Sequence, residues 1–252
     1  MATEIRSYRA EIAQNHTREM SEKYPGYINN SIYNSPVYTS ETKFKETDDS
    51  MRKTPEVTFE NLDTVSALYK HKDSPRIAVL NFASFKHPGG GFVDGSMAQE
   101  EALCHESDLY NVLCKFTEFY KYNNENLNQG MYSNRAIYCR NVLFSRNGYV
   151  TFADVITVAS PNKIPAIRYK SFSNAENHAA LKSRIEFIRD IAENENVDTL
   201  ILGAFGCGVF LQDPEEVADL FKETFRETTV KRIVYAVPGN DRNAEVFSEV
   251  FG

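Results

Sequence analysis

Two apolar segments that each lead into a glycine-rich loop constrain the fold of this 252-residue chain more than any other feature. Arg76–Phe82 (RIAVLNF) is mostly apolar and Thr199–Gly203 (TLILG) continuously so, which is typical of strands buried on both faces of a parallel sheet. Amphipathic helices are expected between the strands, for example over 174–193 and after Pro214, which occupies a first helical position. The pattern predicts one α/β domain with a mostly parallel sheet covered by helices on both faces.

The rest of the chain continues this alternation. A helix over 3–23 is expected to pack on the core through Ile5, Tyr8, Ile12 and Ala13. Residues 24–54 are polar and without clear periodicity, and we expect them to form a long surface segment or partly ordered arm. The further expected elements are a strand at 57–59, a helix at 62–69, one helix over about 97–120, strands at 136–144, 149–159 and 232–237, and a last helix at 240–251.

The first loop reads GGGFVDGSMAQEE, from Gly89 to Glu101. The triplet Gly89–Gly91 is typical either of a flexible turn or of a backbone that approaches a phosphate or ribose closely. Gln99 can form a capping box with Ser96, and acidic residues in a first turn favour the helix dipole. The other interpretation of the adjacent carboxylates is general acid chemistry, which requires a pKa raised against the effect of the helix N-terminus.

The second loop, GAFGCGVF, covers Gly203–Phe210. It lacks both the P-loop pattern and the dinucleotide-binding fingerprint, which disfavours a Rossmann-type oxidoreductase. It is either a tight strand-to-helix turn or a diphosphate-binding loop with Phe210 as a wall. Ligands in open α/β sheets bind beyond the carboxyl ends of strands, so the two loops are expected to face one ligand.

Composition narrows the function classes. The net charge of −7 and the pI of about 5.4 argue against general nucleic-acid binding. The four cysteines have no zinc-ligand spacing, and neither a metal nor a cofactor is indicated. The N-terminal residues are polar, and no apolar run is long enough to cross a bilayer, so we expect a cytoplasmic protein without membrane contact.

Taken together, the motifs resemble the bacterial-type poly(ADP-ribose) glycohydrolases. The resemblance rests on the GGG-x7-QEE spacing, on VLNFAS at Val79–Ser84, on ITVASPN at Ile156–Asn162 and on LGAFGCGVF at Leu202–Phe210. It implies a three-layer α/β/α macrodomain-like fold with a mostly parallel mixed sheet. The whole chain, 1–252, would be one such domain, with a helical N-terminal extension over about 1–54.

The resemblance also implies roles for individual residues. Glu101 would be the general acid, and Glu100 would hold the hydroxyls of the distal ribose. The substrate-binding residues that it implies are Asn81, Gly89, Gly90, Gly91, Gln99, Gly206, Cys207, Gly208, Val209 and Phe210, together with Phe247 for adenine stacking.

The implied activity is hydrolysis of the ribose–ribose bond of poly(ADP-ribose), mainly from chain ends, with release of ADP-ribose. Two alternatives stay open at this point. The same cleft could remove single ADP-ribose units from ADP-ribosylated proteins, or it could bind ADP-ribose without turnover. The intact QEE sequence favours an enzyme over a reader.

Overall fold

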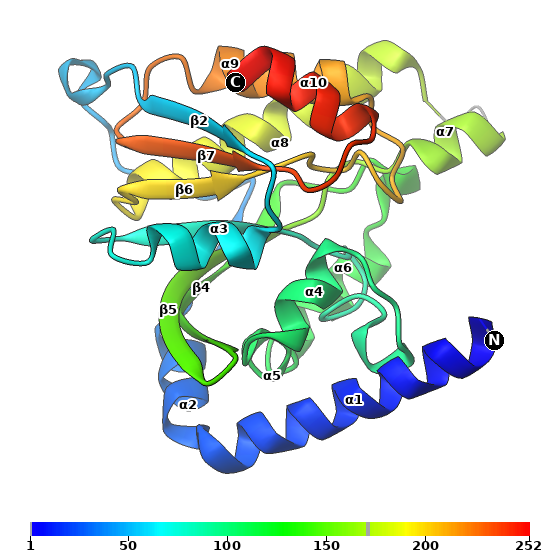
Figure 1. Ribbon diagram of the computed structural model, residues 1–252. Helices are drawn as coiled ribbons and strands as arrows, with labels where there is room; N and C mark the ends of the chain where they lie inside the picture. The colour runs from blue at the N-terminus through cyan, green and yellow to red at the C-terminus, as the bar shows by residue number, and fades with distance from the viewer. Residues whose placement is uncertain (1, 170–171) are drawn as a thin grey trace.

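The computed structural model describes residues 2–169 and 172–252, and in this part of the chain seven strands join one sheet in the order β1-β4-β5-β3-β6-β7-β2 (Figure 1). β3 pairs in parallel with β5 and β6, and β7 pairs in parallel with β6 and β2. β1 and β4 are antiparallel to their neighbours. The strands are β1 (Val37–Thr39), β2 (Glu56–Glu60), β3 (Ile77–Phe82), β4 (Arg135–Arg146), β5 (Tyr149–Val158), β6 (Thr199–Leu202) and β7 (Arg232–Ala236).

Helices cover both faces of this sheet, as the sequence predicts. The helices α8, α9 and α10 lie on one face, and α1 to α5 lie on the other (Figure 1). The α-helices are α1 (Ala2–Lys23), α2 (Pro25–Asn34), α3 (Thr64–His71), α4 (Gln99–His105), α5 (Leu109–Leu113), α6 (Thr117–Glu125), α7 (Lys163–Tyr169), α8 (Asn174–Asn194), α9 (Pro214–Thr224) and α10 (Arg242–Phe251). Three short 3₁₀ turns complete the described part of the chain: η1 (Asp49–Met51), η2 (Phe92–Asp94) and η3 (Asn128–Gly130).

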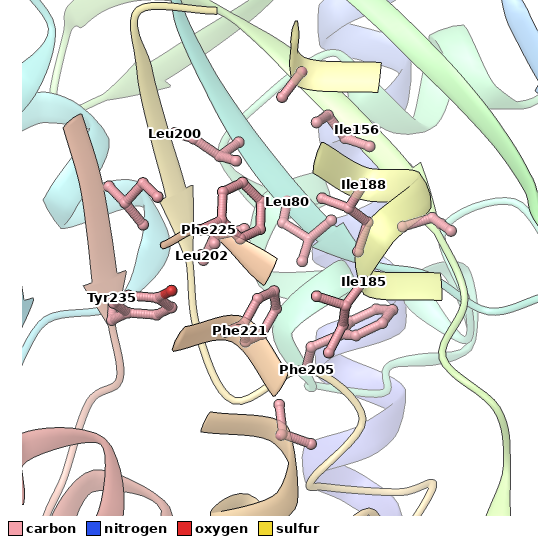
Figure 2. Packing of buried hydrophobic residues seen from close by; sticks show 14 of the residues in the cluster. Leu80, Ile156, Ile185, Ile188, Leu200, Leu202, Phe205, Phe221, Phe225 and Tyr235 are labelled. Atoms are coloured by element: carbon pink, nitrogen blue, oxygen red, sulfur yellow. The ribbon is translucent and has the colours of Figure 1, made fainter. Parts of the chain in front are cut away.

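The central strand β3 shows why the apolar segments are continuous. Ala78 and Leu80 face the cluster beneath α8 and α9, whereas Ile77 and Val79 face the cluster on the other side. Figure 2 shows Leu80 packed with side chains of β5, β6 and the covering helices in the first of these clusters. Both faces therefore exclude water, and burial of each such side chain contributes about 1.5–3 kcal/mol to folding.

The helix expected over 97–120 is wrong as a single element, because the chain forms α4, α5 and α6 there. The break after α4 has a clear cause. The N–H of Asp108 donates to the carbonyl of Leu143 (3.0 Å), and the N–H of Ser145 donates to the carbonyl of Glu106 (2.8 Å). Residues 106–108 thus pair with β4, which stops the helix; the apolar spacing alone carries no sign of this long-range pairing.

The expected surface segment over 24–54 is also corrected. It contains α2, the edge strand β1 and the turn η1. α2 begins with Pro25 at its first position and packs on the core through Ile28, and β1 pairs with β4. The sequence prediction misses these elements because each is short and has few buried side chains.

The N-terminal helix is present, but its expected apolar face is only partly right. Ala13 and Met20 are buried, whereas Ile5, Tyr8 and Ile12 are 48, 65 and 40% exposed. The structure also contains α7, which the sequence pattern does not predict. No helix in the described part of the chain is both long enough and apolar enough to span a bilayer.

Candidate active site

The site is a cavity of about 900 Å³ at the carboxyl ends of the parallel strands. This volume lies within the range of small-molecule sites. The two glycine loops line the same cavity: Gly90, Gly91 and the QEE residues come from the first, and Gly206, Gly208, Val209 and Phe210 from the second. Their expected convergence on one space is therefore what the structure shows.

Gly90 lies directly against the two carboxylates. Its φ is +61°, and a Cβ at this position would stand 2.5 Å from Glu101 Oε1 and 3.1 Å from Glu100 Oε2. A side chain cannot fit there without moving a carboxylate. In the first loop the glycine backbone therefore lies close to the carboxyl groups of Glu100 and Glu101.

Glu101 is held at both carboxylate oxygens. Oε1 accepts from the N–H of Gly91 (2.9 Å), and Oε2 accepts from the N–H of Ala98 (2.9 Å). The residue is buried and lines the cavity. It therefore closes the N-terminus of α4 and fastens the glycine loop with the same side chain.

Glu100 lies deeper, at 3% exposure. It accepts hydrogen bonds from the N–H of Ser84 (2.7 Å) and from Nδ2 of Asn81 (3.2 Å). Burial nevertheless dominates and raises the pKa of Glu100 to about 8. At neutral pH this side chain is therefore mostly protonated in the ligand-free protein and can act as a hydrogen-bond donor.

Gln99 is not paired with Ser96 in a capping box. Its Oε1 accepts from the N–H of Phe82 (2.9 Å), and its Nε2 donates to the carbonyl of Leu80 (2.8 Å) and to Thr64 Oγ1 (3.1 Å). The amide thus bonds the backbone of the last residues of β3 and fixes α4 to the sheet.

Two expected ligand contacts lie behind the cavity wall. Asn81 is fully buried, and its Nδ2 donates to Glu100 and to Thr157 Oγ1 (3.3 Å). Gly89 (φ +66°) faces Tyr110 and Cys104. Neither residue is among those lining the cavity, so both support the site from behind.

The second loop has free backbone donors. Within the described part of the chain, the N–H groups of Gly206, Gly208, Val209 and Phe210 donate no hydrogen bond to the protein, whereas that of Cys207 donates to the carbonyl of Ala204 (3.1 Å). In the first loop the N–H groups of Gly90 and Gly91 are already occupied, by His87 O and by Glu101. The second loop therefore has more N–H groups available to bind an anion than the first loop.

Cys207 itself points away from this cavity. It lines a neighbouring cavity of about 510 Å³ on the other side of the loop. Burial raises the pKa of its thiol to about 12, which keeps it protonated and unreactive at neutral pH.

The expectation for Phe247 is corrected. Its ring is fully buried and packs against Tyr235 and Phe251, with centroids 5.8 and 5.7 Å away. A ring that belongs to the core and does not line the cavity has no face for adenine.

Several lining residues were missed from the sequence. Ser160 follows the end of β5, and Val237, Pro238 and Asn243 follow the end of β7. Their position beyond strand ends is the signal that could have found them. Tyr132, which packs edge-on against Phe210 with centroids 6.1 Å apart, has φ +58° and gives no recognisable pattern in the sequence.

No group of three or more His, Cys, Asp or Glu side chains is placed to hold a metal ion among the described residues. The polar groups that face the cavity are carboxylates, backbone N–H groups and hydroxyls. Such a set suits sugar hydroxyls and a phosphate group.

Similarity to known proteins was found both in a family model and in solved structures. Residues 4–147 match the family model for the microbial-type PARG catalytic domain. A search of curated protein sequences found no match.

Solved structures match nearly the whole chain. The poly(ADP-ribose) glycohydrolase (PARG) of Thermomonospora curvata has a TM-score of 0.85 at 25% identity, over 98% of this chain and 100% of that one. A structure of the same enzyme bound to the inhibitor ADP-HPD gives a TM-score of 0.84 at 25% identity, over the same shares of both chains.

The PARG of Deinococcus radiodurans in complex with ADP-ribose has a TM-score of 0.78 at 25% identity, over 88% of this chain and 96% of that one. These matches confirm the expected α/β fold with a mixed, mostly parallel sheet. With the family model covering more than half of its residues, this chain belongs to the microbial-type PARG catalytic-domain family.

Proposed function

We propose that the protein hydrolyses the ribose–ribose O-glycosidic bond of poly(ADP-ribose), mainly from chain ends, and releases ADP-ribose. The observation that carries this proposal is the placement of Glu100 and Glu101 in one cavity with the free N–H groups of the second glycine loop. Family membership supports it, since related glycohydrolases bind ADP-ribose and the inhibitor ADP-HPD.

In this mechanism Glu101 is the general acid. It transfers a proton to the oxygen of the leaving ribose while the bond from that oxygen to the anomeric carbon breaks. The resulting carboxylate then takes a proton from the water that adds to the anomeric carbon, which restores the acid. Two backbone N–H groups hold the Glu101 carboxyl group in place.

Glu100 binds the hydroxyls of the distal ribose. With a pKa raised to about 8, its protonated carboxyl can donate one hydrogen bond and accept others. Asn81 and Ser84 fix its orientation. Gln99 acts through the sheet, by holding α4 and hence both glutamates.

The diphosphate is assigned to the second loop. The N–H groups of Gly206, Gly208, Val209 and Phe210 supply donors without a side-chain charge. The Phe210 ring lies beside the ribose. The negative diphosphate in turn stabilises the oxocarbenium-like transition state.

The test compares Glu101→Gln with the neighbouring control Glu100→Gln. Each purified protein is incubated with poly(ADP-ribose) or with a mono-ADP-ribosylated protein, and free ADP-ribose is measured. Removal of a general acid costs about 10²–10⁴-fold in rate. We expect Glu101→Gln to lose at least that much polymer turnover while keeping ADP-ribose affinity, and Glu100→Gln to raise KM.

Other outcomes assign other functions. Turnover of the mono-ADP-ribosylated protein alone would make the chain a mono-ADP-ribosyl hydrolase. Binding of ADP-ribose without any turnover would make it a reader. Unchanged polymer turnover in Glu101→Gln would remove the acid role from Glu101.

A further inference from the structure

Arg184 is a buried cation without an anionic partner. It lies on α8, on the face turned to the sheet, and is only 1% exposed. Its hydrogen bonds go to three neutral oxygens: the carbonyls of Ala159 and Met131 (3.4 Å) and the amide oxygen of Asn134 (2.7 Å). Within the described residues no carboxylate pairs with it.

Such an arrangement is costly, because a buried guanidinium loses its hydration and here gains no counter-charge. Burial lowers the pKa of Arg184 to about 9, which still leaves it charged at neutral pH. Among the described residues, four buried carboxylates have a cationic partner within 4 Å: those of Glu60, Asp154, Glu193 and Glu195. The cost at Arg184 therefore calls for an explanation outside the stability of the ligand-free protein.

The three acceptors belong to two segments that border the proposed active site. Ala159 precedes Ser160, which lines the cavity and packs directly against Gly206 of the second glycine loop. Met131 precedes Tyr132, which stacks on Phe85 with centroids 4.2 Å apart and meets Phe210 edge-on. Arg184 thus connects the segment that packs against the second glycine loop with the segment that packs against the Phe210 ring.

Further contacts make these segments one unit. The N–H of Asn162 donates to the carbonyl of Gly130 (2.8 Å), and the N–H of Lys163 donates to the carbonyl of Phe210 (2.9 Å). A shift of Arg184 would therefore reach Phe210 from two sides.

We propose that Arg184 is a positioning residue for the diphosphate of the ligand: it fixes the segments on either side of Phe210 and keeps an uncompensated positive charge behind the second glycine loop. The inference rests on the proposed function, in which this loop holds a diphosphate. The negative diphosphate then compensates the positive charge of Arg184, which has no anionic partner in the protein alone. Ser160 and Gly206 lie between the two charges.

The sharpest test is Asn134→Asp. This isosteric change puts a carboxylate oxygen where an amide oxygen now lies 2.7 Å from Arg184 Nε, so it neutralises the charge and keeps the contact. Calorimetry gives the Kd of adenosine and of ADP, which differ only by the diphosphate, and their ratio is the phosphate preference. Neutralising the Arg184 charge weakens its Coulomb attraction for the diphosphate, and a tenfold loss of affinity corresponds to about 1.4 kcal/mol at 25 °C. We expect the phosphate preference to fall about tenfold with adenosine affinity kept. Some thermal stability is lost, because an aspartate cannot make the donations from Asn134 Nδ2 to the hydroxyl (2.9 Å) and the carbonyl (3.3 Å) of Ser183.

Asn147→Asp is the charge-matched control, because Asn147 is exposed in the turn between β4 and β5. It should leave the phosphate preference unchanged. A merely structural role of Arg184 predicts the same for Asn134→Asp, since the new ion pair keeps Arg184 bonded to the segment that it holds. An unchanged preference in Asn134→Asp would therefore overturn the inference.

Arg184→Lys and Arg184→Met separate the charge from the shape. Lysine keeps the charge, so the phosphate preference should be retained, but it cannot hold three acceptors in the geometry of a guanidinium, so polymer turnover should fall. Methionine has neither the charge nor the hydrogen-bond donors, so both the phosphate preference and polymer turnover should fall. Equal phosphate preferences in the two variants would refute the role of the charge. Failure of the wild-type protein to bind ADP-ribose would instead refute the proposed function, and this inference with it.

Discussion

The substitution Gly90→Ala tests whether the glycine at this position is required for the placement of the Glu100 and Glu101 carboxyl groups. In Gly90→Ala the new Cβ would stand 2.5 Å from Glu101 Oε1, so the carboxylate or the loop has to move. Movement of the carboxylate breaks its bond to the Gly91 N–H, which is 2.9 Å long. Hydrogen bonds to charged groups contribute about 1.5–3 kcal/mol.

The left-handed backbone adds a second cost, of about 1–2 kcal/mol for a residue with a Cβ. Gly148→Ala isolates this cost. Gly148 has φ +81° and nothing within 4 Å of the Cβ that alanine would add, and it lies far from the cavity in the β4–β5 turn. We therefore expect Gly148→Ala to lose about 1–2 kcal/mol of unfolding free energy and Gly90→Ala about 3–4 kcal/mol.

Thermal unfolding of both variants measures this difference, at about 2–4 °C per kcal/mol for a chain of this size. ADP-ribose release from polymer measures the effect on the site. Gly90→Ala should reduce kcat at least about 100-fold, because a displacement of a catalytic group by 1 Å has an effect of this size; Gly148→Ala should be fully active. Equal melting temperatures and equal rates in the two variants would refute the reasoning.

Three further predictions concern single side chains. Phe210→Ala should lower kcat/KM for polymer at least about tenfold while shifting Tm little, because the half-buried ring lines the cavity and packs edge-on against Tyr132; a variant that fails to fold would show that Phe210 is a core residue. Gln99→Leu should destabilise the fold by about 2–3 kcal/mol in urea unfolding, because it leaves the N–H of Phe82 without its acceptor; no loss would show that the amide is dispensable. For Glu100, the folded state holds its proton more tightly than the unfolded chain, so this stabilisation is complete below pH 4.5 and is lost as pH rises towards about 8. Unfolding free energies measured from pH 5 to 8 should therefore fall less steeply in Glu100→Gln than in the wild type, and parallel curves would contradict the burial argument.

The parallel strands at the centre of the sheet were predictable because they are apolar and are followed by helices with capping signals. The strand at Ile77–Phe82 and the helix at Asn174–Asn194 follow from local pattern alone. The break after α4 and the pairing of β1 were not predictable, because they depend on contacts with β4, which is distant in sequence. A pattern within a window of a few residues contains no information on such pairing.

The sequence predicted which segments form the site, but not which role each segment has in it. The two glycine loops and the QEE residues meet as expected, yet the first loop uses its N–H groups internally and the second keeps them free. Burial also separates the neighbours Asn81 and Phe82, of which only Phe82 lines the cavity. Such distinctions depend on where each group points after folding, which residue type does not reveal.

The bonds of Gln99 to the backbone of Phe82 and Leu80 have a consequence for how this architecture can change over evolution. Gln99, the first residue of α4, is hydrogen-bonded to the end of β3. Glu100 and Glu101 are therefore held by the rigid sheet and not by a loop. Surrounding loops can lengthen, shorten or exchange residues, and with them the preferred ligand, while the distance from acid to sheet stays the same. Insertions are therefore expected to accumulate around the rim and to spare the junction between Phe82 and Gln99.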